Sequence, residues 1–121
     1  MPVAIESRRT ARADQDTEFG LSARALALLR GLLARYPQIR LARIYGSRAK
    51  GNYREGSDID IALDAPDMPF DTYLKLCGEI DDLLLPWDVD LTLLSHIDHP
   101  DLLKHIERVG QVLWQKPLMK S

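Results

Sequence analysis

Three aspartates stand at spacings that could bring them together on one face of a β-sheet. Asp58 and Asp60 are two residues apart in a segment of alternating apolar residues, so both carboxylates should point to the same face of a strand. Asp90 lies in a later segment that alternates in the same way. Carboxylates side by side on one face repel each other unless a cation lies between them. The pattern therefore favours a site for magnesium, a hard ion that binds a few carboxylates together with phosphates and water.

A glycine and a serine ahead of these aspartates would suit a bound phosphate. Gly46 lets the backbone approach a phosphate closely, and Ser47 offers a hydroxyl and an amide at a predicted turn. Two magnesium ions about 3.5–4 Å apart can clamp the attacking and leaving oxygens of an in-line displacement at phosphorus. Together with the three aspartates, the Gly-Ser turn predicts transfer of a phosphorus-containing group.

Basic residues crowd the segment that leads into the acidic pair. They are Arg40, Arg43, Arg48, Lys50 and Arg54, and only Glu55 opposes them. Although the whole chain has a net charge of -2, its basic side chains are concentrated in the segment where a triphosphate would need them. For Arg48 and Lys50, a solvated surface is an equally good interpretation.

Simpler interpretations exist for each pattern taken alone. Outward charges are ordinary on half-exposed strands, and a Gly-Ser pair is commonly only a turn. The full spacing together with Asp90 is what favours chemistry. The histidines His96, His99 and His105 match no compact zinc-ligand set, and the single cysteine does not join them. We interpret these histidines as caps or surface groups of the last helix.

Composition limits the class of protein. The 121 residues are enough for one domain, and 45% hydrophobic with 28% charged residues is typical of a globular protein. The slightly acidic balance argues against broad nucleic-acid binding, which normally needs a basic face. One cysteine permits no internal disulfide. The sequence shows no membrane-length apolar run and no secretory signal, so we expect a cytoplasmic protein.

Hydrophobic periodicity predicts the elements that must position the candidate residues. Helices are expected over 21–36, 71–85 and 100–109, with Ser22 and Asp71 as caps of the first two. Strands are expected over 39–45, 58–63, 87–94 and 112–114, and a loop over 46–56 with one helical turn at 48–50.

This order of elements predicts an α/β (α+β) fold, a small mixed sheet with helices packed on one side. We expect residues 1–19 to be a flexible leader, 20–116 to be the single domain and 117–121 to be a tail.

The motif residues resemble the signature of a known family. Residues 45–51, Tyr-Gly-Ser-Arg-Ala-Lys-Gly, and 56–61, Gly-Ser-Asp-Ile-Asp-Ile, are similar to the signature of minimal nucleotidyltransferases (MNT) of the DNA polymerase β superfamily. Residues 85–91, Leu-Pro-Trp-Asp-Val-Asp-Leu, resemble the strand that supplies a third carboxylate there. The resemblance covers residues 21–115. Asp88 departs from it, because the family pattern has one aspartate here and this chain has two.

The resemblance implies a polymerase-β-like nucleotidyltransferase fold and a role for each matched residue. Asp58 and Asp60 would bind two Mg²⁺ ions, and Asp90 would bind the catalytic ion and help to deprotonate the attacking hydroxyl. Gly46 and Ser47 would hold the β and γ phosphates of ATP or another NTP. The remaining expected nucleotide contacts are Arg48, Lys50 and Ser57.

The resemblance also implies a protein partner. Minimal members are typically paired with a small helical protein of the HEPN type encoded beside them. In some pairs this partner is a toxic RNase, and the nucleotidyltransferase silences it by attaching AMP to a tyrosine. We therefore expect a magnesium-dependent nucleotidyltransferase that acts as an antitoxin by moving AMP from ATP to its partner.

Two other functions stay open at this point. One is a non-catalytic antitoxin that neutralises its partner by contact, and the other is a small-molecule transferase of the aminoglycoside-modifying kind. The absence of room for an acceptor-binding domain counts against the second. The sequence does not specify the preferred base, the acceptor, the number of nucleotides added, the role of Asp88, or whether the chain forms an oligomer.

Overall fold

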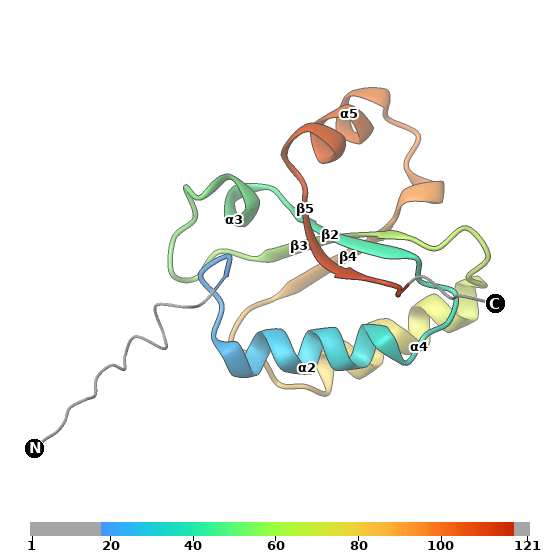
Figure 1. Cartoon of the computed structure of the whole chain (residues 1–121), viewed down its shortest axis with the longest axis horizontal. Coiled ribbons are helices and arrows are strands. Elements are labelled where there is room, and N and C mark those ends of the chain that lie inside the picture. The colour runs from blue at the N-terminus through green and yellow to red at the C-terminus, as the bar shows by residue number, and fades with distance from the viewer. Residues whose placement is uncertain (1–17, 118–121) are drawn as a thin grey trace, which may run out of the picture.

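A four-stranded sheet forms the centre of the fold in the computed structural model, which describes residues 18–117 (Figure 1). The strand order is β4-β3-β2-β5. The bounds are Leu41–Tyr45 for β2, Ile59–Asp64 for β3, Val89–Leu93 for β4 and Gln111–Gln115 for β5. β2 is antiparallel to both β3 and β5, whereas β3 and β4 are parallel. The predicted α/β fold with a small mixed sheet is confirmed.

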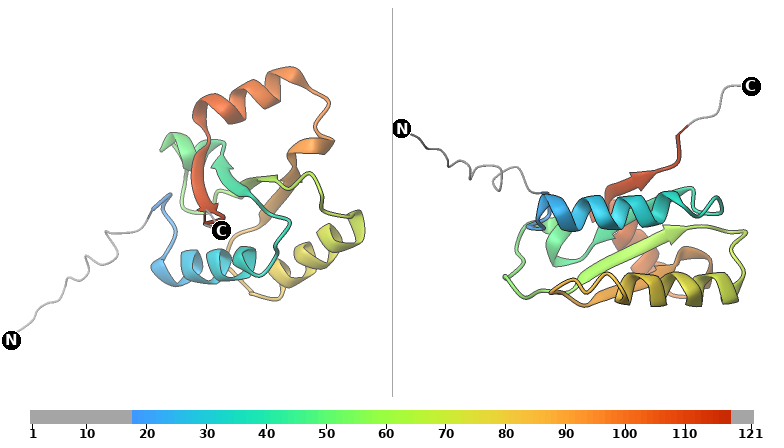
Figure 2. Two further views of the ribbon diagram at one scale, coloured as in Figure 1. Left: turned by 45° about the vertical axis from the view of Figure 1, so that its right-hand side comes forward. Right: turned by 90° about the horizontal axis from the view of Figure 1, so that it is seen from below.

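Helices α2 and α4 cover the apolar face of this sheet (Figures 1 and 2). The helices are α2 (Ala23–Ala34), α3 (Ser47–Lys50), α4 (Phe70–Asp81) and α5 (Pro100–Val109), with a short 3₁₀ turn at Leu94–His96. The alternating residues Ile59, Ile61 and Leu63 of β3 are fully buried in the main core cluster. Because neighbouring strand residues point to opposite faces, Asp60, Ala62 and Asp64 lie on the other face.

Helix α5 departs from the expected packing of helices on one side. It lies away from α2 and α4, beyond the opposite face of the sheet (Figure 1). Its Ile106 is 1% exposed and lines a small hollow together with Leu41, Arg43 and Asp64, which belong to that opposite face. The face has few apolar side chains to offer, so α5 buries little of itself there.

Three predicted helix ends differ in how well they agree with the structure. The cap at Ser22 is confirmed, because its Oγ accepts a hydrogen bond from the amide of Ala25 at 3.1 Å. The cap predicted at Asp71 is wrong, since α4 begins at Phe70 and places Asp71 within its first turn. α4 also ends at Asp81, four residues before the predicted end, and Leu84 then takes a left-handed φ of 56° that cannot continue a helix.

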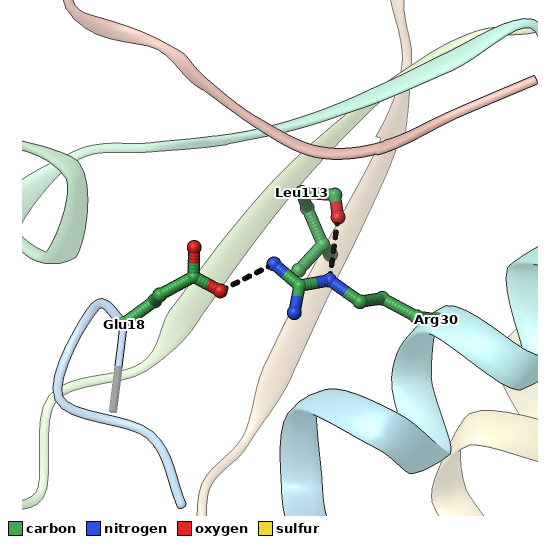
Figure 3. A network of polar contacts seen from close by, with 3 residues as sticks. All are labelled: Glu18, Arg30 and Leu113. Carbon is green, nitrogen blue, oxygen red and sulfur yellow. Dashed lines mark hydrogen bonds and ion pairs between the residues drawn. The ribbon is translucent and has the colours of Figure 1, made fainter. Parts of the chain in front are cut away.

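A network of polar contacts joins the first described residues to the domain (Figure 3). Arg30 of α2 donates from Nη2 to Glu18 Oε1 at 2.6 Å and from Nε to the carbonyl of Leu113 at 2.8 Å. Glu18 and Phe19 fall within the predicted leader (1–19), but Glu18 binds Arg30 and the carbonyl of Phe19 accepts a hydrogen bond from Arg48. The rest of the predicted leader (1–17) and most of the predicted tail (118–121) lie outside the described residues. Within residues 18–117, no helix is long and apolar enough to cross a membrane.

Candidate active site

Strand pairing brings two of the three predicted aspartates side by side. Asp60 on β3 and Asp90 on β4 are direct partners in the parallel register. Their neighbours Ile59 and Leu91 are buried in the core, so both carboxylates stand on the opposite face. Asp58 precedes β3 by one residue, at the same end of the sheet. The structure therefore gathers the predicted acidic residues at one edge of one face.

Electrostatics show that these carboxylates influence one another. Burial raises the pKa of Asp60 first, and the negative charges of Asp90 and Asp58 raise it further. Asp60 is half-buried, whereas Asp58 and Asp90 are exposed. A raised pKa for an acid means that the ionised form is disfavoured in the folded protein. A cation between these groups would offset that cost.

The Gly-Ser turn lies directly against Asp60. Gly46 follows β2, whose last residue, Tyr45, is the register partner of Asp60. The backbone of Gly46 has φ 75° and ψ -152°, a region that essentially only glycine occupies. A methyl group at this position would lie 2.5 Å from Oδ2 of Asp60, closer than real contacts allow. Glycine is therefore required here both by the backbone conformation and by the approach of the carboxylate.

The three aspartates are suitable ligands for a divalent metal ion, but their side chains are not arranged around a common point. Asp58, Asp60 and Asp90 offer the oxygen ligands that magnesium prefers, and their mutual repulsion favours a cation. Among residues 18–117, however, no three Asp, Glu, His or Cys side chains are arranged as a ready metal site. The carboxylates would have to turn toward one another to share an ion. Their metal-binding role remains a prediction.

Arg48, which the sequence predicts to contact a phosphate, instead contacts backbone carbonyls. Its side chain is 2% exposed, and it donates hydrogen bonds to the backbone carbonyls of Phe19, Glu55 and Ser57. Burial lowers the pKa of Arg48, while interactions with Tyr53 and Asp58 oppose this effect. A guanidinium committed to carbonyls is poorly placed to bind a phosphate.

The other two predicted nucleotide contacts differ in their surroundings. Ser57 closes the turn before Asp58, because its Oγ accepts from the amide of Arg54 at 2.8 Å and its own amide donates to the Arg54 carbonyl at 3.0 Å. Lys50 is exposed at the end of α3, where Gly51 takes a left-handed conformation. Lys50 can reach a solvent-side ligand, whereas the contacts of Ser57 are within the loop.

Asp88 is the second aspartate of the segment that leads into β4. It lies one residue before β4, is exposed, and lines a hollow with Leu84 and Trp87 beside the end of α4. Its backbone carbonyl accepts a hydrogen bond from the amide of Ile59 at 2.9 Å, so its main chain continues the pairing of β4 with β3. The structure therefore gives Asp88 a place in the pairing of the two strands, and its side chain a place in the hollow.

Tyr45 is a site residue that the sequence analysis did not assign. It is the last residue of β2 and the register partner of Asp60, which is in turn the register partner of Asp90 on β4. Burial raises the pKa of Tyr45 most; an interaction with Thr92 lowers it, and the charges of Asp60 and Asp90 raise it. The signal was available, because buried Ile44 implies that Tyr45 faces the side of the acidic residues.

Comparison with known proteins identifies the family. The family model described as "Polymerase beta, Nucleotidyltransferase" matches residues 29–117. This chain belongs to the polymerase β nucleotidyltransferase family. The predicted family is thereby confirmed, and the matched residues of this nucleotidyltransferase include the Gly-Ser turn and all three aspartates. A search of curated proteins finds no match.

Several solved structures are similar to this nucleotidyltransferase. A chain in a crystal structure of a toxin–antitoxin with AMP-PNP is 28% identical, with a TM-score of 0.62 over 75% of this chain and 73% of that chain. A structure of a tri-AMPylated Shewanella oneidensis HEPN toxin in complex with an MNT antitoxin is 26% identical, with a TM-score of 0.52 over 77% and 68%. A protein from Sulfolobus solfataricus, 17% identical with a TM-score of 0.53, covers 93% of each chain and shows the fold alone.

Proposed function

We propose that this nucleotidyltransferase moves AMP from ATP to a tyrosine hydroxyl of a HEPN-type toxin and thereby acts as its antitoxin. The observation that carries the proposal is the contact of the Gly46 turn with Asp60, which is itself the register partner of Asp90. The glycine turn expected to bind phosphate and two of the predicted metal ligands therefore lie next to one another. The similar structures support the nucleotide and the partner, since one contains AMP-PNP and another an AMPylated HEPN toxin.

Different residues of the site would bind the phosphates and the metal in such a transfer. The backbone of Gly46 and the hydroxyl of Ser47 would hold the terminal phosphates, leaving the α-phosphate near the aspartates. Asp58, Asp60 and Asp90 would hold magnesium, which when bound neutralises phosphate charge and stabilises the attacking and leaving oxygens. Positioning and charge neutralisation supply most of the rate enhancement in this chemistry.

The transfer forms one bond at the α-phosphorus and breaks another. The acceptor oxygen forms a bond to the α-phosphorus, and the bond from that phosphorus to the bridging oxygen of the β-phosphate breaks. Pyrophosphate leaves with the electron pair of that bond. The carboxylate of Asp90, which is exposed on the site face, takes the proton of the acceptor hydroxyl.

Intact mass spectrometry tests this proposal. The HEPN-type partner encoded beside this chain is incubated with the purified nucleotidyltransferase, magnesium and each NTP in turn. We expect the partner to gain one or more AMP units with ATP, and Asp58→Asn to abolish the gain. Asp67→Asn makes the same chemical change at an exposed turn outside the site and should leave the gain intact.

The other functions give different outcomes in the same experiment. A contact-only antitoxin would yield no mass gain, and Asp58→Asn would neutralise the toxin as well as the wild type does. A small-molecule transferase would modify a hydroxylated antibiotic in the absence of any protein partner and would leave the mass of the toxin unchanged. An unchanged toxin mass with every NTP would refute the proposed transfer to the toxin.

A further inference from the structure

We propose that Arg48 is a positioning residue, whose buried guanidinium holds together the three chain segments that carry the Gly-Ser turn and the aspartates. This inference rests on the proposed function of the site. It replaces the phosphate contact predicted for Arg48 with an indirect role, in which Arg48 acts through the residues it holds.

Hydrogen bonds from Arg48 reach two segments distant from α3. Nε and Nη2 donate to the carbonyl of Ser57 at 3.1 and 2.9 Å, and Nη2 also donates to that of Glu55 at 3.3 Å. Nη1 donates to the carbonyl of Phe19 at 2.8 Å. Ser57 immediately precedes Asp58. Arg48 therefore fixes the backbone that leads into the first aspartate relative to the turn at Gly46.

Aromatic contacts extend the same assembly to the third aspartate. The guanidinium carbon of Arg48 lies 5.0 Å from the ring centre of Tyr53 and 5.4 Å from that of Trp87. Trp87 Nε1 also donates to the carbonyl of Glu55 at 3.1 Å. Trp87 leads into β4, where Asp90 stands. The side chain of Arg48 thus contacts the segments that precede Asp58 and Asp90, and its own helix follows Gly46.

Arginine has the chemistry that this position needs. Its planar guanidinium keeps its charge when buried and presents donors in a rigid fork, while its faces can stack on aromatic rings. Within residues 18–117, Arg48 is paired with carbonyls and rings and forms no ion pair with a carboxylate. A buried charge held only by such geometry makes the arrangement sensitive to small changes. Lysine would keep the charge but lose both the fork and the stacking.

The test compares Arg48→Lys with Arg108→Lys, the same change at an exposed arginine of α5. Two quantities are measured: hydrogen exchange of the amides of residues 51–58, and kcat and KM for ATP in transfer to the toxin. For Arg48→Lys we expect exchange at least about tenfold faster in this loop. We expect kcat to fall about 10²-fold, because displacing a catalytic group by about 1 Å can lower the rate by that factor. KM for ATP should change much less. Arg108→Lys should match the wild type in both.

A second variant guards against a failure of Arg48→Lys to fold. Trp87→Phe keeps a ring over the guanidinium and removes only the bond to Glu55, so it should shift loop exchange and kcat in the same direction by less. Unchanged loop exchange in both variants, or in Trp87→Phe alone if Arg48→Lys does not fold, would overturn the proposal. A raised KM for ATP with unchanged exchange and kcat would also overturn it, since that is the result expected of a direct phosphate contact.

The two proposals can fail separately. Loop exchange depends on Arg48 whether or not the protein transfers nucleotide, so it decides the positioning role by itself. A wild-type protein that transfers nothing, but whose loop exchange rises in Arg48→Lys, would refute only the proposed function.

Discussion

Replacing Gly46 with alanine tests the close approach of the Gly-Ser turn to Asp60. The added methyl group would lie 2.5 Å from Oδ2 of Asp60, whereas ordinary contacts begin at 3.4 Å. One of the two groups must therefore move by about 0.9 Å, the difference between these distances. The turn and the carboxylate are the parts that must face the same nucleotide, so this movement disturbs the site itself.

The expected size of the effect follows from the strain and from the displacement. The φ of 75° and ψ of -152° at Gly46 would cost alanine about 1–3 kcal/mol of folding free energy. In a domain of this size that corresponds to a fall of roughly 4–8 °C in the unfolding midpoint for each kcal/mol. A displacement near 1 Å should lower kcat for nucleotide transfer about 10²-fold.

Two other glycines separate strain from the clash with Asp60. Gly51 has a φ of 87° and Gly31 lies in α2, and a methyl group would meet nothing within 4 Å at either position. Gly51→Ala should therefore lose stability but keep most of its activity. Gly31→Ala should gain about 0.5–1 kcal/mol, as expected for alanine in a helix. Thermal unfolding and transfer of AMP to the toxin are measured for all three variants.

One comparison would refute the reasoning. If Gly46→Ala transfers nucleotide as fast as Gly51→Ala, the contact between the turn and Asp60 does not matter for the chemistry. If Gly46→Ala is as stable as the wild type, the backbone at this position is not strained in the way described.

Two further predictions concern ionisation and packing. In EDTA, Asp60→Asn should raise the unfolding midpoint at about pH 7, because burial and the charges of Asp90 and Asp58 raise the pKa of Asp60 and disfavour its ionised form. The gain should disappear at about pH 3, where Asp60 is protonated in both the folded and the unfolded state. An equal gain at both pH values would contradict this electrostatic explanation. Tyr36→Phe should lower the free energy of unfolding by about 1 kcal/mol without loss of transfer, because it removes the hydrogen bond from Tyr36 in the chain after α2 to Glu79 of α4. Burial and then Glu79 raise the pKa of Tyr36 to about 12, so between pH 10 and 12 the wild type should lose more stability than the variant, which keeps only the losses from Tyr73 and Tyr45; parallel pH curves in denaturant titrations would contradict this.

Much of the site could be predicted from local pattern. Strict alternation around Asp58 and Asp60 placed both carboxylates away from the core, and the structure agrees, because side-chain direction in a strand follows from position alone. The cap at Ser22 depends on contacts within three residues and was equally predictable. The end of α4 was missed because apolar periodicity continued past Asp81, while the backbone at Leu84 had left the helix.

The sequence by itself determined the residue types, the face on which each aspartate stands, and the family. Only the tertiary structure decided that Asp90 pairs with Asp60 and that Asp88 lines a hollow beside the end of α4. It alone placed Arg48 in a buried assembly with distant carbonyls and rings. The physical reason is range: periodicity and capping act within a few residues, whereas strand register and side-chain burial depend on which distant segments meet.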